Sequence, residues 1–75
     1  MDYYFLNTGT ITKASSGRDI LRKNRIWAYV KAANGNLAAS GCGYGIVIRK
    51  ADKPRATALL QSNRINIISI MPTEN

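Results

Sequence analysis

The sequence predicts one small α+β domain with the element order βαββαβ, and three observations lead to this prediction. First, the chain has 75 residues, a length that suits a single domain with a thin core. Second, residues 20–26 (ILRKNRI) and residues 59–65 (LLQSNRI) repeat one phrase, and a β-favouring run follows each copy. Third, Asn34-Gly35 between the copies is typical of a two-residue hairpin turn.

The repeat predicts two strand-helix-strand units joined by a hairpin. Asn24 and Asn63 lie 39 positions apart, as do Ile26 and Ile65, and this offset extends the repeat to residues 3–31 and 42–70 of a single domain, 1–75. The expected arrangement is the ferredoxin-like split βαβ, with an antiparallel sheet, two short helices and a loose tail at 71–75. The alternative is an antiparallel meander of three or four strands with one helix, over residues 54–62.

The first unit begins with a strand over residues 3–12, bulged at Gly9. Residues 14–17 predict a turn, and Ser16 with Asp19 has the spacing of a capping box. A short helix then runs over residues 17–24. This helix offers few apolar side chains, so we expect it to depend on packing against the sheet.

Residues 25–32 predict the second strand, because apolar and exposed positions alternate there. One face carries Ile26, Ala28 and Val30, and the more exposed face carries Trp27, Tyr29 and Lys31. After the Asn34-Gly35 turn, residues 37–43 either continue the hairpin or form a flexible loop. Glycines 41, 43 and 45 precede a strand and no Gly-Lys-Ser/Thr follows them, which excludes a phosphate-binding P-loop.

The second unit begins with the clearest strand, residues 45–49. Asp52 is expected to cap the next helix, with Pro54 in its first turn and an inward stripe of Ala56, Leu59 and Leu60. Residues 65–70 predict a last strand that is buried on more than one side. We interpret Asn24 and Asn63 as residues that close the helices, because Asn tolerates the left-handed conformation that ends a helix. The roles of Arg25 and Arg64 stay open.

The composition favours binding of a polyanion over catalysis. Eleven Lys and Arg against four Asp and Glu give a net charge of +7, which attracts nucleic acids and acidic surfaces. The chain has no His, and its carboxylates provide no acid-base pair, so we expect no enzyme, no catalytic residue and no cofactor. A single cysteine, Cys42, and the absence of His predict no metal site and no intrachain disulfide.

The environment of the chain follows from the same composition. No apolar stretch is long enough to span a membrane, and the acidic, aromatic start of the chain is unlike a signal peptide. We therefore expect a cytoplasmic protein without membrane contact. A homodimer or a bound partner would complete its thin core.

Residues 43–48 (GYGIVI) resemble part of the third-strand signature of the RNA recognition motif, a family with the same βαββαβ order. In that family, aromatic side chains of the sheet stack on bases, and basic neighbours hold phosphates. Here Cys42 replaces the leading Lys or Arg, and Ile46 and Ile48 stand where the family has aromatic rings. Helices packed on these isoleucines would turn Tyr44 inward. We interpret the segment as a core strand and do not assign the chain to the family.

Two groups of basic residues occupy corresponding places in the repeat, so we expect one continuous basic surface. The predicted binding residues are Arg18, Arg22, Lys23, Arg25, Arg49, Lys50, Lys53, Arg55 and Arg64. Trp27, Tyr29 and Tyr44 are the predicted aromatic contacts, with Tyr3 and Tyr4 nearby. The first hypothesis is a small module that binds RNA or DNA through the backbone. The alternative is a protein-binding inhibitor or accessory factor, of the kind carried by phages or mobile elements, that docks on an acidic surface of host machinery.

Overall fold

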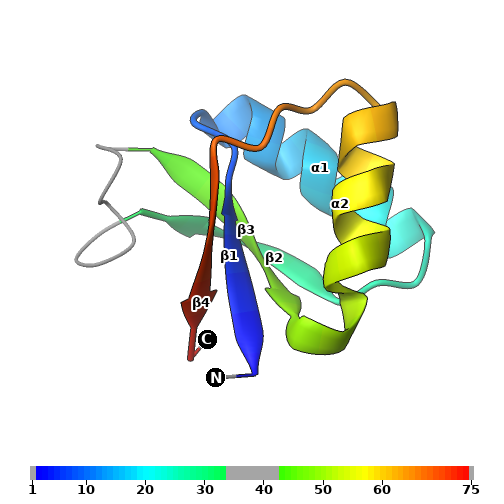
Figure 1. Ribbon diagram of the computed structural model, residues 1–75. Coiled ribbons are helices and arrows are strands. Elements are labelled where there is room, and N and C mark those ends of the chain that lie inside the picture. Colours follow the sequence, from blue (N-terminus) through cyan, green and yellow to red (C-terminus); the bar gives the residue numbers. More distant parts are fainter. Residues whose placement is uncertain (1, 34–42, 75) are drawn as a thin grey trace.

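The computed structural model describes residues 2–33 and 43–74, and it confirms the predicted α+β fold. The elements are β1 (Tyr3–Asn7), α1 (Ile11–Lys23), β2 (Ala28–Ala32), β3 (Tyr44–Arg49), the short 3₁₀ helix η2 (Lys50–Asp52), α2 (Lys53–Ser62) and β4 (Ser69–Thr73). They form one antiparallel sheet in the order β2-β3-β1-β4, with both helices on one face (Figure 1). The Asn34-Gly35 turn and residues 37–42, with Gly41 and Cys42, lie outside the described residues.

Helix α1 begins earlier than the sequence predicts. Thr10 caps it, because its side-chain oxygen accepts a hydrogen bond from the Lys13 backbone N–H at 3.2 Å. Gly9 has a φ of +91° and turns the chain from β1 into this cap, so the strand over residues 10–12 and the bulge at Gly9 were wrong. The turn at residues 14–17 and the Ser16–Asp19 capping box were also wrong, since these residues lie inside α1.

Helix α2 lies where the sequence predicts it, but its predicted side-chain cap does not form. Asp52 makes no side-chain capping hydrogen bond, so the predicted cap was wrong. The reason is that η2 runs directly into α2, which gives Asp52 a helical backbone (φ −93°, ψ 0°) in place of the extended backbone that a capping residue needs. Pro54 lies in the first turn as expected.

Strand β4 lies later in the chain than predicted, at Ser69–Thr73 instead of residues 65–70. Ile65 belongs to the core between the helices and the sheet, whereas Ile68 and Ile70 are 57% and 38% exposed. The expectation of burial on several sides was therefore wrong, because β4 is an edge strand that pairs with β1. Pro72, which has no N–H to donate, is accommodated at this edge, and residues 71–73 are strand, not tail.

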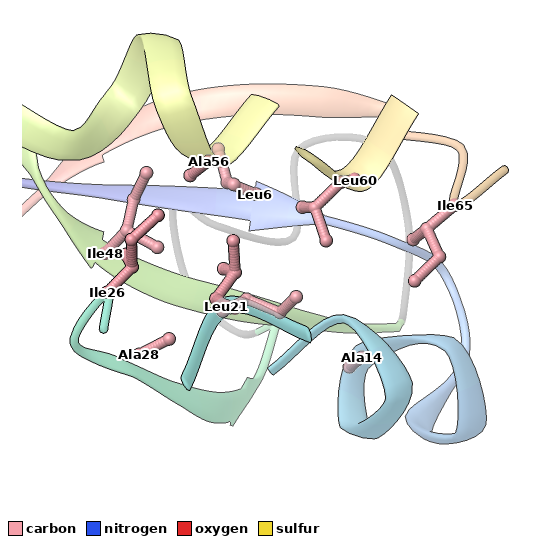
Figure 2. Close-up of a cluster of buried hydrophobic side chains, with 10 residues drawn as sticks. Leu6, Ala14, Leu21, Ile26, Ala28, Ile48, Ala56, Leu60 and Ile65 are labelled. Carbon is pink, nitrogen blue, oxygen red and sulfur yellow. The ribbon is translucent and has the colours of Figure 1, made fainter. Parts of the chain in front are cut away.

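The main core lies between the sheet and the helices. Leu6 of β1 and Ile48 of β3 lie below Ala56 and Leu60 of α2, and Leu21 comes from α1 (Figure 2). The alternation predicted for β2 is confirmed, since Ala28 and Val30 pack in this core. A second cluster occupies the opposite, helix-free face, where Phe5 and Val47 are fully buried beside Tyr3, Tyr29 and Met71.

The repeated phrase closes both helices in the same way. After α1, the N–H of Ile26 donates to the carbonyl of Leu21, and the N–H of Arg25 donates to that of Arg22. After α2, Ile65 donates to Leu60 and Arg64 donates to Gln61. This paired pattern is the Schellman motif, in which the aliphatic residue after the turn packs on the last helical turn.

The left-handed residue of each motif is an arginine. Asn24 and Asn63 do close the helices, but with φ near −100°, whereas Arg25 and Arg64 both have φ of +62°. The side-chain amide of each Asn instead donates to a carbonyl four residues earlier, at 2.8 Å in both cases. The left-handed conformation that we expected of the asparagines is thus taken by the next residue, and Gly is the residue that usually occupies this position.

Replacing Arg25 with Gly should stabilise the protein by about 0.5 to 1 kcal/mol relative to Arg25→Ala, because Gly adopts positive φ without steric cost. Both variants lack the arginine side chain, so their difference isolates the backbone contribution. Urea unfolding of the two variants measures it. Equal free energies of unfolding would show that φ at residue 25 carries no strain.

Replacing Gly45 with Ala should destabilise the fold by roughly 1 to 3 kcal/mol through overpacking. A Cβ at this position of β3 would lie 2.5 Å from Phe5 Cζ and closer still to the Leu6 carbonyl oxygen, which is backbone and cannot move aside freely. The measurement is the urea midpoint of unfolding. An unchanged midpoint would contradict the close packing of Phe5 over Gly45.

Candidate functional site

The helix-free face of the sheet carries an ordered array of side chains. Strand pairing places Trp27, just before β2, in one row with Arg49 of β3 and Tyr3 of β1, because Ala28 pairs with Ile48 and Tyr3 pairs with Arg49. The next row along the strands contains Tyr29, Val47, Phe5 and Met71. Phe5 and Val47, the buried residues of the second row, form a close-packed base beside the more exposed first row.

Three aromatic residues on this face, Tyr3, Trp27 and Tyr29, form an aromatic cluster. The ring centroids of Tyr3 and Trp27 are 5.5 Å apart, and those of Trp27 and Tyr29 are 5.3 Å apart, with tilted and edge-on geometries. The Arg49 guanidinium lies over the Trp27 ring, 5.3 Å from its centroid. Trp27 remains 37% exposed. The cluster joins β1 and β2, which are not neighbours in the sheet.

The predicted basic groups meet at the end of the molecule where β1 begins and β3 ends. Arg55 near the start of α2 donates to the backbone carbonyl of Asn24 at the end of α1, at 3.2 Å. This contact places the end of α1, with its basic group, next to the start of α2, with the other group. We call this group of seven cations the basic edge, which comprises Arg22, Lys23, Arg25, Arg49, Lys50, Lys53 and Arg55.

Some of these side chains also have structural contacts. Arg22 Nε donates to the carbonyl of Ala28 at 3.1 Å and so ties α1 to β2. The Lys53 ammonium lies 4.9 Å from the ring centroid of Tyr4. Lys23 and Lys50, by contrast, are exposed and make no side-chain hydrogen bond or ion pair within residues 2–33 and 43–74.

Three predicted site residues lie elsewhere. Arg18 forms an ion pair with Asp19 at 3.2 Å on α1. Arg64 follows the other end of α2, about 15 Å along the helix axis from Lys53, and lines a separate hollow with Gln61, Ile65 and Asn66. Tyr44 is 37% exposed at the first position of β3, on the face of the isoleucines and apart from the aromatic cluster.

Sequence reasoning missed two features of the surface. Lys31 lies on the helix-free face with Trp27 and Tyr29, as the alternation of β2 predicts, but it was not counted among the binding residues. The contact between Arg49 and Trp27 joins a residue of β3 with a residue of the segment before β2. No local sequence pattern predicts such a contact.

An open hollow of about 550 Å³ adjoins the aromatic cluster where the helix-free face meets the basic edge. Its walls come from Asp2, Tyr3, Arg49, Lys50 and Ala51. The hollow therefore places an aromatic ring next to two cations, with the Asp2 carboxylate opposing part of that positive charge. This combination suits a group that has both a flat apolar part and negative charge.

The described part of the chain has four carboxylate side chains, those of Asp2, Asp19, Asp52 and Glu74. The carboxylate of Asp19 pairs with Arg18. Neither Asp19 nor Asp52 caps a helix with its side chain. Within the described ranges no three His, Cys, Asp or Glu side chains gather as metal ligands would. No helix among the described residues has both the length and the apolar character needed to cross a membrane.

Alkaline titration should report the environment of the aromatic cluster. Burial, and to a smaller extent the nearby Tyr3, raises the pKa of the Tyr29 hydroxyl above its ordinary value. Because the folded state favours the protonated form, the unfolded chain loses this proton first, and stability should fall as pH rises above about 10. Ultraviolet titration of wild type and Tyr29→Phe should show that the variant loses a transition whose pKa lies above the ordinary value of about 10. Loss of an ordinary transition would contradict this assignment.

Comparison of the chain with protein-family models, curated proteins and solved structures finds no match. Any functional conclusion therefore depends on the surface formed by the chain's own residues.

Proposed function

We propose that the chain is a small, non-enzymatic module that binds nucleic acid through the phosphate backbone. The observation that carries this proposal is the contact of Arg55 with Asn24, which makes the cations of α1 and those before and within α2 one basic edge. Phosphate oxygens accept hydrogen bonds from Arg and Lys whatever the base sequence of the nucleic acid. Such a surface therefore favours affinity over base specificity.

The charge balance at the basic edge supports an anionic ligand. Asp2, Asp52 and Glu74 lie in the neighbouring segments, but the cations outnumber them, and Asp19 is engaged by Arg18 on α1. Each arginine has five N–H donors, so Arg22 and Arg55 retain donors for phosphate after their contacts with backbone carbonyls. Lys23 and Lys50 are exposed and add charge, and their side chains make no hydrogen bond or ion pair within the described residues.

A protein partner with an acidic surface is the second candidate function. The observation that favours it is the composition of the aromatic cluster, since Trp, Tyr and Arg are the residues that most often dominate the energy of protein interfaces. Charges of the basic edge would then steer association. Titration with polyglutamate, which has charge but no bases or sugars, separates this candidate from the first.

Charge reversal at Lys23 and Lys50 should weaken nucleic-acid binding and its salt dependence. Each lost phosphate contact should reduce the slope of log K against log salt concentration by about 0.7 to 0.9. Fluorescence anisotropy with a labelled oligonucleotide, over a salt series, measures the slope for Lys23→Glu/Lys50→Glu. These two side chains are preferred to Arg22 and Arg55 because their replacement breaks no hydrogen bond.

The matched control is Lys13→Glu/Arg64→Glu, which changes the net charge equally. Lys13 lies about 15 Å along α1 from Lys23, and Arg64 lies at the far end of α2, so the control should retain most of the affinity. An equal loss of affinity in both double variants would indicate that net charge attracts the nucleic acid and that the basic edge is not a specific binding site. Binding that does not respond to salt would contradict phosphate recognition.

A further inference from the structure

The aromatic cluster lies beside a close-packed base that can hold its rings in place, so that the cluster can serve as a rigid platform for a ligand. Phe5 and Val47, in the row beside it, are fully buried although no helix of the described residues covers this face. The Phe5 ring reaches this position by packing over Gly45, which has no side chain to obstruct it. The Trp27 and Tyr3 rings are thus held by neighbours on a sheet, and a ligand that stacks on them would lose little entropy in ordering them.

The electrostatic surroundings of the platform favour a ligand that is both aromatic and anionic. Among the described residues, the helix-free strand positions carry Arg49 and Lys31 and no carboxylate. The hollow beside the platform adds Lys50 to Arg49 and Tyr3, and these two cations exceed the single carboxylate in its lining, Asp2. Nucleobases supply flat π-faces and their phosphates supply negative charge at short and regular intervals, which matches rings and cations in alternation.

The position of the Trp27 and Tyr3 rings on the face of a sheet favours a single-stranded ligand. In a duplex the base faces are covered by neighbouring base pairs, so rings on the face of a sheet cannot reach them. In a single strand the bases can turn out and lie on aromatic side chains. We propose, resting on the nucleic-acid binding proposed above, that Trp27 and Tyr3 stack on bases of a single strand while Arg49 and Lys50 contact the adjacent phosphates.

Arg49 connects the two kinds of contact. Its guanidinium lies over the Trp27 ring in the free protein, 5.3 Å from the centroid. A guanidinium is itself a planar surface on which bases stack, and it binds phosphate through paired N–H donors. A bound strand therefore either stacks on the Arg49–Trp27 pair or draws Arg49 to a phosphate and exposes the Trp27 ring. Both routes change the environment of the indole.

The test uses the fluorescence of Trp27, which is the single tryptophan of the chain. Wild-type protein is titrated at low salt with oligodeoxythymidine, with an abasic strand of equal length and charge, and with a duplex of equal length. Oligodeoxythymidine should quench Trp27 and bind roughly tenfold to a hundredfold more tightly than the abasic strand, the range expected for loss of base stacking. The duplex should bind without this quenching.

Variants then locate the stacking. Trp27→Leu and, separately, Tyr3→Leu should lower affinity for oligodeoxythymidine by roughly tenfold, measured by anisotropy, and leave affinity for the abasic strand unchanged. The matched control is Tyr44→Leu, because Tyr44 has the same exposed fraction as Trp27, 37%, but lies away from the platform. Circular dichroism establishes that each variant is folded, and the abasic comparison on the wild-type protein needs no variant at all.

The outcomes separate this inference from the proposed function. Equal affinity for the abasic strand, the duplex and oligodeoxythymidine, without quenching, would overturn stacking and leave phosphate binding in place. Absence of binding to every nucleic acid at low salt would overturn both. Quenching of Trp27 by polyglutamate but by no nucleic acid would also overturn both, and would assign the platform to an acidic protein.

Discussion

The closure of the two helices is the constraint on which the rest of the structure depends. Each helix ends in a Schellman motif whose left-handed residue, Arg25 or Arg64, reverses the chain and inserts the next isoleucine into the core. Once Ile26 is fixed on the helix side, the alternation of a strand places Trp27 on the opposite face. The position of the aromatic cluster is therefore set by a turn that contains none of its residues.

The positive φ of Arg25 and Arg64 is strained, so the presence of arginine at these two positions needs an explanation. Gly would adopt a φ of +62° at lower cost, yet the chain has Arg at both positions. Cationic side chains after a helix interact favourably with its negative end, which offsets part of that cost. At Arg25 the same charge also adds to the basic edge. Arg64 lies away from that edge, so helix electrostatics is the explanation that both arginines share.

Arg49 has a special position because it belongs to both surfaces. It stands between Trp27 and Tyr3 in the first row of the helix-free face, and it also lines the hollow with Lys50. The helix layer and the sheet face are thereby connected around one end of the molecule. A strand of nucleic acid that follows this path would meet phosphate contacts first and aromatic rings next, which relates the proposed function to the proposed stacking.

The sequence by itself determined the order of elements, the alternation of β2 and the closure of both helices, since turn chemistry and periodicity are local properties. It could not place the start of α1, because residues 10–12 favour strand by propensity and only the Thr10 cap and burial of Ala14, Gly17 and Leu21 decide otherwise. Nor could it place β4, where pairing with β1 extends the strand to Thr73 through Pro72. The candidate surface was decided by the tertiary structure. Contacts such as Arg55 with Asn24 and Arg49 with Trp27 join segments far apart in the chain. They depend on the order of strands in the sheet, which no single stretch of residues determines.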